Sequence, residues 1–327
     1  MKISFSPALT LVLLLALAGP ALSAEKRAGP QLPANVQKRA VTIFSDGVRM
    51  AGDLYLPKDL KDGEKLPAIV LCAGTAGTKG STGTRLGPIL VTNGFVVLAF
   101  DYRGWGESDS KLITLEKQPR PDAKGEVEVK ARAVRWQMDF ADQAMDIRAA
   151  ISFVAGEPGV NPERIGIWGS SYGGGLVIWT AGNDPRVKCV AAQVPGMGIR
   201  TPQAEKRAYE YLTKQSRGEV EPVPYETGKF TGKMERYTQM RVNSTKALGY
   251  SPVASAEKIT APTLLVVAEN EELSSNENVE RVFKSLQARN VPAVYHVLKG
   301  MTHYSVYGEA FDECTKLEVE WFGRHLK

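Results

Sequence analysis

Residues 164–175 read Arg-Ile-Gly-Ile-Trp-Gly-Ser-Ser-Tyr-Gly-Gly-Gly, a short apolar run that ends in a Gly-x-Ser-x-Gly turn with Ser171 at its tip. Because Gly169 and Gly173 have no Cβ, the chain can turn sharply and hold the serine hydroxyl clear of the backbone. The apolar stretch 176–181 continues as a helix. This strand, turn and helix predict a nucleophile elbow, and the alternative is an ordinary glycine-rich turn.

Strand-like and helical patterns alternate along most of the chain. A turn at Ser45-Asp46-Gly47 separates two alternating runs, 40–44 and 49–56, which predicts an antiparallel hairpin. Further strands are predicted at 68–73, 95–100, 164–168, 187–194, 263–268 and 293–298, with helices that include 138–154, 278–288 and 309–326. This alternation predicts an α/β fold with a mostly parallel sheet and helices on both faces. Ligands bind beyond the carboxyl ends of such strands, so the loops there are candidate sites.

Two stretches interrupt this rhythm. Residues 108–130 are charged and contain Pro119 and Pro121, which predicts a surface loop. Residues 196–255 separate two core strands and contain five tyrosines and many charges. We expect a helical cap here that lies over the active edge of the sheet and shapes the substrate pocket. The alternative is peripheral packing with no substrate contact.

The N-terminus has the features of a secretory signal. A lysine precedes the apolar stretch 8–18, and the small-residue site Ala21-Leu22-Ser23 follows it. Because the stretch is shorter than the ~20 residues that cross a bilayer, we expect 1–23 to be a cleaved signal peptide, 24–38 a linker and 39–327 the folded domain. The alternative is an uncleaved anchor. The exported chain is expected in the periplasm or outside the cell, with no later membrane span.

The composition argues against several classes of function. The chain has 41 basic and 36 acidic residues among 327, and because this small excess is spread along the sequence, nucleic-acid binding is not expected. Metal-ligand spacing of Cys or His and glycine-rich nucleotide loops are both missing, so neither a metal nor another cofactor is expected. Cys72 and Cys189 lie in apolar runs and are expected in the core, although three cysteines, with Cys314, leave one disulfide possible.

One of the three histidines is well placed to act as a base for Ser171. His296 lies inside a predicted strand, and His325 lies two residues from the end of the sequence. His303 follows Lys299-Gly-Met-Thr302, just past the carboxyl end of the last strand, where a loop can bring the imidazole toward the serine. An imidazole exchanges protons near neutral pH, so it can remove a serine proton and return it to a leaving group. The alternative is a solvent-facing loop histidine.

The acid that orients the imidazole is expected after the strand 263–268, between the serine and the histidine in sequence. Glu269, Glu271 and Glu272 compete for this role. A carboxylate that accepts a hydrogen bond from the imidazole fixes its tautomer and stabilises the imidazolium that develops. We favour Glu271, with Glu272 and then Glu269 behind it, and a solvated surface acid is the alternative role for each.

An oxyanion that develops during acyl transfer needs two backbone donors. Tyr172, the residue after the candidate nucleophile, is expected to supply one N–H group. The glycine-rich loop 72–77 is expected to supply the other, from Thr75 or alternatively from Ala76. The alternative for this loop is a tight turn into the next helix.

Together these features resemble the α/β-hydrolase superfamily, and within it the dienelactone-hydrolase-like and Xaa-Pro-peptidase-like serine hydrolases. The resemblance extends from about residue 41 to the C-terminus, and it rests on Gly169-Ser-Ser-Tyr-Gly173, the Glu271 region, His303 and the run Asp101-Tyr-Arg-Gly-Trp-Gly-Glu-Ser108. It implies an α/β-hydrolase fold with a mostly parallel eight-stranded sheet, helices on both faces and a helical cap insertion.

The sequence departs from the family's pattern in three places. Ala73-Gly74 replaces the usual His-Gly before the oxyanion donor, which still leaves a backbone N–H there. The acid is Glu271 where the family usually has Asp, and its longer side chain requires a shifted backbone. Ser171 replaces the cysteine of the dienelactone hydrolases proper, so no lactone specificity follows. In the family-like run that begins at Asp101, we expect this aspartate to pair with Arg103 and hold the loop, outside the triad.

The signal-like N-terminus, the candidate residues and the resemblance together predict an exported serine hydrolase that cleaves a small-molecule carboxylic ester, with Ser171, His303 and Glu271 as its catalytic triad. A peptidase or amidase of Xaa-Pro type is the alternative, although such enzymes usually carry a propeller for which we expect this chain to be too short. A second alternative is a hydrolase fold kept for binding after catalysis was lost. Every catalytic role has a candidate residue here, which favours the enzyme.

Overall fold

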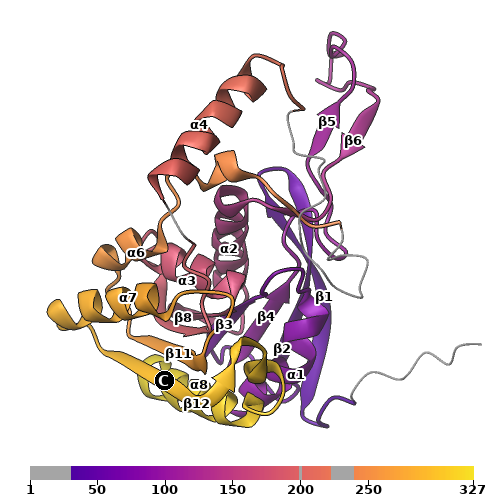
Figure 1. Ribbon diagram of the computed structural model, residues 1–327. Helices are drawn as coiled ribbons and strands as arrows, with labels where there is room; N and C mark the ends of the chain where they lie inside the picture. Colours follow the sequence, from indigo (N-terminus) through magenta and orange to yellow (C-terminus); the bar gives the residue numbers. More distant parts are fainter. Residues whose placement is uncertain (1–30, 199–200, 222–238) are drawn as a thin grey trace, which may run out of the picture. The chain divides into compact units, whose positions relative to one another are not determined.

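The structure is a computed structural model that describes residues 31–198, 201–221 and 239–327. Within this part of the chain, eight strands form one sheet in the order β1-β2-β4-β3-β8-β9-β11-β12 (Figure 1). The strand β2 pairs antiparallel with β1 and β4, and every other neighbouring pair is parallel. The bounds are β1 Val36–Ser45, β2 Val48–Pro57, β3 Leu66–Cys72, β4 Val96–Phe100, β8 Val160–Ser170, β9 Val187–Gln193, β11 Thr263–Asn270 and β12 Ala293–Thr302. The predicted fold class is confirmed.

Helices cover both faces of this sheet, as the alternating pattern predicts (Figure 1). The helices α1 (Lys79–Thr92) and α8 (Phe311–Leu326) pack on one face, around a core that includes Phe95 and Phe322. On the other face lie α2 (Phe140–Ala155), α3 (Tyr172–Ala181) and α7 (Asn276–Ala288). The central strands are therefore buried on both sides, which explains their continuous apolar runs.

The N-terminal hairpin forms where it is predicted. Asp46 and Gly47, between β1 and β2, have φ values of 50° and 77°. A two-residue hairpin turn of this kind needs positive φ at both positions, and Asp-Gly is a favoured pair for it. The strand β1 begins at Val36, so the segment expected as a linker already contributes to the sheet.

The segment 108–130 is mostly exposed, as expected of a surface loop, but it is not free of strands. Its β5 (Leu112–Thr114) pairs antiparallel with β6 (Ala131–Ala133). The two prolines lie between these strands, where no ladder hydrogen bond requires an N–H group. The charged stretch is therefore the tip of a small hairpin.

The described part of the insertion 196–255 is mainly helical. The helix α4 (Pro202–Ser216) begins after Thr201, whose hydroxyl accepts a hydrogen bond from the Ala204 N–H at 3.1 Å. Three short elements follow, β10 (Arg241–Val242), η1 (Ser244–Ala247) and α6 (Pro252–Ser255), before η2 (Ala256–Lys258) leads into β11. The strand β10 pairs with β7 (Gln137–Met138), so the returning chain is anchored just before α2.

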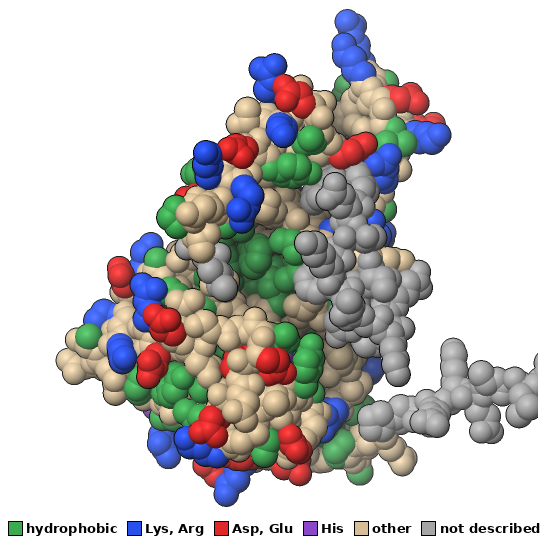
Figure 2. All heavy atoms as spheres, viewed as in Figure 1, with side chains coloured by type: hydrophobic (Ala, Val, Ile, Leu, Met, Phe, Trp, Pro, Cys, Tyr) green, Lys and Arg blue, Asp and Glu red, His purple; other side chains and the backbone are tan. Residues whose placement is uncertain are grey.

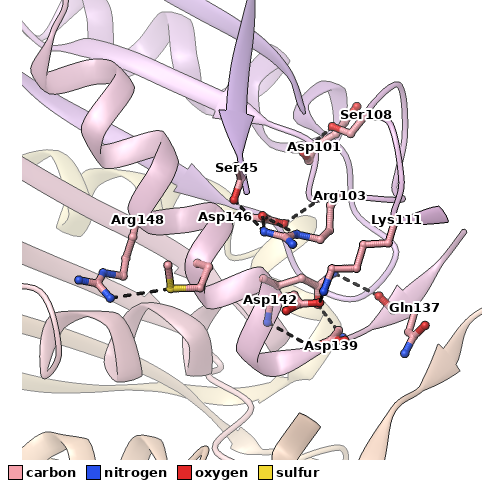
Figure 3. Close-up of polar contacts among 12 residues, drawn as sticks. Ser45, Asp101, Arg103, Ser108, Lys111, Gln137, Asp139, Asp142, Asp146 and Arg148 are labelled. Atoms are coloured by element: carbon pink, nitrogen blue, oxygen red, sulfur yellow. Dashed lines mark hydrogen bonds and ion pairs between the residues drawn. The ribbon is translucent and has the colours of Figure 1, made fainter. Parts of the chain in front are cut away.

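The expected pairing of Asp101 with Arg103 is wrong. The Asp101 carboxylate accepts hydrogen bonds from the backbone N–H groups of Lys79 at 2.6 Å and Glu107 at 2.9 Å. The Arg103 guanidinium instead lies 2.6 Å from the buried carboxylate of Asp146 on α2 (Figure 3). The loop turns back at Gly104 and Gly106, both with positive φ. The Asp101 carboxylate then contacts its own loop and the start of α1, and the Arg103 guanidinium contacts α2.

The described residues test the expectations about a later membrane span and about the cysteines. The predicted signal peptide, residues 1–23, lies outside the described residues. Among those that are described, no helix is long and apolar enough to span a bilayer. Cys72, Cys189 and Cys314 are all buried and unpaired, so the first two lie in the core as predicted and the possible bridge does not form.

Candidate active site

Ser171 lies at a strained turn between β8 and α3. Its φ of 53° and ψ of −120° are conformations that residues with a side chain rarely adopt. A Cβ on Gly169 would lie 2.4 Å from the Gly173 carbonyl oxygen, and one on Gly173 would lie 2.3 Å from the Cys72 carbonyl oxygen. Both contacts are too close for any side chain, so the two glycines of the motif are required by packing as well as by the turn.

The strand β12 ends at Thr302, and His303 begins the short helix η3 (His303–Tyr307). The Ser305 hydroxyl accepts a hydrogen bond from the Thr302 N–H at 3.1 Å and so closes the first turn of this helix. The His303 residue is 2% exposed, and its Nε2 lies 2.9 Å from the Ser171 Oγ. The structure therefore brings together a hydroxyl and an imidazole from residues 132 positions apart in the sequence.

The Glu271 carboxylate lies on the other nitrogen of the same ring. His303 Nδ1 is 2.8 Å from Oε1 and 2.9 Å from Oε2 of Glu271, and the Leu273 and Ser274 N–H groups donate to Oε1 at 2.9 and 3.0 Å. Burial raises the pKa of Glu271, but the hydrogen bonds from His303 and from the two N–H groups outweigh it, and the pKa lies below its ordinary value. The carboxylate is therefore ionised at neutral pH and holds Nδ1 protonated, which leaves Nε2 free to accept a proton.

The two competing carboxylates contact the end of β12 and the residue that follows it. Glu272 Oε2 accepts a hydrogen bond from the His303 backbone N–H at 2.9 Å. Glu269 accepts from the Gly300 N–H at 2.8 Å and from Lys299 Nζ at 2.9 Å, and these hydrogen bonds lower its pKa. Glu269, near the end of β11, therefore contacts β12 itself, whereas Glu272 contacts the His303 backbone just after that strand. Of these three acids, Glu271 contacts the imidazole.

The expected oxyanion donors come from two segments that pack closely. Tyr172 is the first residue of α3, where backbone N–H groups lack partners within the helix. A Cβ on Gly74 would lie 3.0 Å from the Ser170 carbonyl oxygen and 3.3 Å from the Ser171 Cβ, so the loop containing Thr75 and Ala76 abuts the elbow. Ala76 has a φ of 56°, which marks a sharp reversal in that loop. Both predicted donors therefore lie on segments beside Ser171.

An aromatic cluster lies beside the elbow. Tyr172 stacks on Trp105 with ring centroids 6.0 Å apart, and Phe140 contacts Tyr172 at 5.3 Å and Tyr250 at 4.7 Å. Tyr250 belongs to the insertion, so the insertion contributes to this cluster. Figure 2 shows a hollow lined by hydrophobic side chains beneath α4, in the part of the view where α2 and α3 lie in Figure 1. These surroundings suit an apolar group of a substrate.

Sequence reasoning missed Gln193, the last residue of β9. Its carbonyl oxygen accepts a hydrogen bond from the Ser171 N–H at 3.0 Å, and its side-chain amide donates to the Ser170 Oγ at 2.9 Å. Gln193 is 4% exposed, and it lies opposite Ser170 in the register of β8 and β9. A polar residue at the end of the strand next to the elbow was the signal available in the sequence.

The other candidate groups lie elsewhere. His296 Nε2 is 2.9 Å from a Glu313 carboxylate oxygen, and the His325 ring packs against Trp321 with centroids 4.2 Å apart. A groove of about 870 Å³ between the tip of β1 and α2 is lined by none of the candidate site residues named for the triad and the oxyanion. In the described ranges, no group of three or more His, Cys, Asp or Glu residues could hold a metal ion.

The sheet order, the elbow at Ser171 and the imidazole beside it define a serine hydrolase of the α/β-hydrolase superfamily, and this confirms the predicted resemblance. A family model for the X-Pro dipeptidyl-peptidase family matches residues 46–207. A model for the prolyl oligopeptidase family matches residues 136–327, more than half of the chain, and the protein belongs to that family.

Individual relatives are more distant. An uncharacterized 31.7 kDa protein of Escherichia coli is 25% identical over 288 residues, which cover 80% of this chain and 92% of that protein. The quorum-quenching protein AidA of Acinetobacter baumannii is 32% identical over 166 residues, which cover 51% of this chain and 45% of that protein. A hypothetical protein of Pseudomonas aeruginosa has a similar structure, with a TM-score of 0.67 and 22% identity over 94% of this chain and 99% of that one. This last likeness shows the fold alone.

Proposed function

We propose that this hydrolase is exported and cleaves carboxylic esters through an acyl-enzyme, with Ser171, His303 and Glu271 as its catalytic triad. One observation carries the proposal: the imidazole lies 2.9 Å from the serine oxygen on one side and 2.8 Å from a buried carboxylate on the other. This arrangement supports a hydroxyl that can be deprotonated as it attacks.

In the proposed reaction, Ser171 Oγ attacks the ester carbonyl carbon while its proton passes to His303 Nε2. The carbonyl oxygen becomes an oxyanion, which the N–H groups of Tyr172 and Thr75 stabilise. As the tetrahedral intermediate collapses, the bond to the alkoxy group breaks and His303 returns the proton to the leaving alcohol. Water then attacks the acyl-enzyme in the same way, releases the carboxylic acid and restores Ser171. Throughout both steps, Glu271 fixes the ring and stabilises the imidazolium.

Replacement of the nucleophile tests this proposal. Ser171→Ala is expected to lower turnover of p-nitrophenyl acetate by several orders of magnitude, because the group that forms the acyl-enzyme is gone. Ser285→Ala, on α7, is the matched control and is expected to retain activity. A fluorophosphonate probe is expected to label the wild-type protein and the control variant but not Ser171→Ala. Full ester turnover by Ser171→Ala would contradict the mechanism, and an unlabelled wild type would favour a non-catalytic binding protein.

The second candidate function is a peptidase or amidase of Xaa-Pro type, which the matches to the prolyl oligopeptidase and X-Pro dipeptidyl-peptidase families favour. The hydrophobic hollow beneath α4 favours the ester, because such a surface offers few polar partners for a charged substrate amine. The kcat/KM values for p-nitrophenyl acetate and for an aminoacyl-proline p-nitroanilide separate the two. A higher value for the anilide would make the protein a peptidase that uses the same triad.

Export is part of the proposal and rests on the apolar stretch and the small-residue site near the N-terminus. Expression in a Gram-negative host followed by fractionation tests it. The mature protein is expected in the periplasm or the medium, with an N-terminus near Ala24. An intact N-terminus in the membrane fraction would identify an uncleaved anchor instead.

A further inference from the structure

Tyr307 makes a second contact between η3 and the nucleophile elbow. Its hydroxyl lies 2.6 Å from the Oγ of Ser170, the residue just before the proposed nucleophile. His303, at the other end of the same five-residue helix, contacts Ser171. Two adjacent residues of the elbow therefore each meet one end of η3. Neither Ser170 nor Tyr307 has a part in the proton transfers described above.

The Ser170 hydroxyl is held in place from the other side. Ser170 is 1% exposed, and its Oγ accepts a hydrogen bond from the side-chain amide of Gln193 at 2.9 Å. The Gln193 carbonyl oxygen accepts from the Ser171 N–H at 3.0 Å, so the same residue fixes both serines. Because a buried hydroxyl with one filled acceptor position still has a proton and a lone pair, Ser170 can complete its hydrogen bonding with Tyr307.

The Tyr307 hydroxyl lies beside the loop that contains Gly74. It and the Ser171 Cβ are both within 3.4 Å of the point where a side chain on Gly74 would begin. Gly74 precedes Thr75, the expected oxyanion donor. The hydroxyl therefore lies where the elbow, the oxyanion loop and η3 meet, so a shift of this contact would change the distance between them.

The backbone at the end of η3 is held as well. Arg85 Nη1 donates to the Tyr307 carbonyl oxygen at 2.7 Å, and the same guanidinium lies 3.7 Å from the centroid of the Phe311 ring. These contacts tie the end of η3 to α1 and to the start of α8. At the other end of η3, the His303 backbone N–H donates to Glu272 at 2.9 Å. The side chains of His303 and Tyr307 add the contacts with the elbow.

We propose that Tyr307 and Ser170 are a positioning pair, which holds η3 against the elbow and sets the contact between His303 Nε2 and Ser171 Oγ. This inference rests on the proposed function of His303 and Ser171 and adds the residues that fix their separation. A displacement of reacting groups by about 1 Å can cost on the order of 100-fold in rate, so one lost hydrogen bond here would be felt in turnover.

The test compares two tyrosines of the same short helix. Tyr307→Phe removes the hydroxyl that contacts Ser170, and Tyr304→Phe, the matched control, removes a hydroxyl from a side chain that is 62% exposed. We expect Tyr307→Phe and Ser170→Ala each to lower kcat for p-nitrophenyl acetate on the order of 10-fold to 100-fold, with KM changed less than twofold. Fluorophosphonate labelling of Ser171 is expected to slow by a similar factor, and Tyr304→Phe to match the wild type.

Two further readouts separate positioning from a general loss of stability. The double variant Ser170→Ala, Tyr307→Phe is expected to lose no more activity than the worse single variant, because both remove the same contact. The acid limb of the kcat profile against pH is expected to shift in Tyr307→Phe, because the hydrogen bond between His303 Nε2 and Ser171 Oγ changes its length. Additive losses with an unchanged pH profile would overturn the positioning pair.

Proton NMR distinguishes failure of this inference from failure of the proposed function. If the wild type is neither labelled nor active, the proposed function fails, and the Nδ1 proton of His303 still reports where the ring lies. A changed chemical shift of this proton in Tyr307→Phe, with no change in Tyr304→Phe, supports the positioning pair. An identical chemical shift in all three proteins contradicts it.

Discussion

The carboxyl edge of the sheet and the insertion that follows β9 are held by different kinds of contact. At the edge, polar groups such as His303 and Asp146 are 2% and 0% exposed, and each has charged or hydrogen-bonded partners. In the insertion, α4 buries one side chain, that of Ala208, and its ion pair between Lys206 and Glu210 is exposed. Exposed pairs contribute little stability, whereas breaking a buried pair is costly. The residues of the proposed reaction therefore lie at a buried edge, whereas α4 is held mainly by exposed contacts.

The largest effect is expected at the buried acid of the edge. Glu271→Gln keeps the shape of the side chain but removes the charge that orients and stabilises the imidazolium, so turnover is expected to fall on the order of 10³- to 10⁴-fold. Glu269→Gln, in an exposed residue that contacts β12 and not the imidazole, is the control and is expected to lose less than tenfold. Steady-state kinetics at pH 7 decides, and similar losses in both variants would break the assignment of Glu271.

The lowered pKa of Glu271 also fixes the sign of its pH dependence. Its ionised form contributes stability above the unfolded value, about 4.3, and this contribution is lost as the pH falls through the lower folded value. The difference in unfolding free energy between the wild type and Glu271→Gln is therefore expected to shrink below about pH 4. Urea unfolding at pH 7 and pH 3 measures this difference, and an equal difference at both pH values would contradict the lowered pKa.

The next largest effect is expected where Arg103 meets Asp146. Arg103→Met leaves the Asp146 carboxylate buried without its partner, which is expected to cost about 3–5 kcal/mol of unfolding free energy. Arg49→Met removes an exposed pair with Asp109, whose side chains are 66% and 49% exposed, and is expected to change stability little. Urea unfolding of the two variants compares a buried arginine pair with an exposed one. Equal losses would show that burial does not set the difference.

A smaller effect, on the stability of the core, is expected at Glu318 of α8. Burial raises the pKa of this carboxyl to about 8. It is neutral in the folded state and ionised in the unfolded state between about pH 4.3 and that value, so stability falls with rising pH by at most about 1.4 kcal/mol per unit. Glu318→Gln is expected to remove this dependence, whereas Glu320→Gln, exposed on the same helix, is expected to keep it. Thermal unfolding from pH 5 to pH 8 measures the slopes, and parallel slopes in all three proteins would contradict the burial argument.

The smallest effects are expected in the insertion. Tyr209 and Leu212 on α4 are 55% and 39% exposed, so replacing both with Ala is expected to change unfolding free energy by less than about 1 kcal/mol. The ratio of kcat/KM for a long-chain p-nitrophenyl ester to that for the acetate is expected to change a few-fold. This is less than the roughly 10-fold that one methylene contributes in an apolar pocket, because both side chains are exposed. Fluorophosphonate labelling should be unchanged. An unaltered ratio would mean that α4 packs peripherally, as the alternative holds.

Local patterns predicted much of the fold. The Asp46-Gly47 turn, the buried strands and the helices on both faces follow from periodicity and backbone sterics, which act over a few residues. The strand pair within 108–133 was missed for two reasons. The strands β5 and β6 have three residues each, and a long charged segment separates them in the sequence. The partner of Arg103 was mistaken because Asp101 is near it in sequence, whereas Asp146 becomes its neighbour only when α2 packs on the sheet.

The sequence by itself determined the elbow at Ser171, the importance of its two glycines and the position of His303 after the last strand, because each depends on short-range sterics and on the order of the elements. Tertiary structure alone decided which of three nearby carboxylates reaches the imidazole, and it revealed Gln193, Ser170 and Tyr307 around the serine. The contacts of Ser170 with Gln193 and Tyr307 join residues that are far apart in the sequence. Glu271 and Glu272 are neighbours in the sequence, yet one contacts the imidazole and the other the backbone N–H of His303. Their distances depend on how strands and loops pack, and no local pattern records that packing.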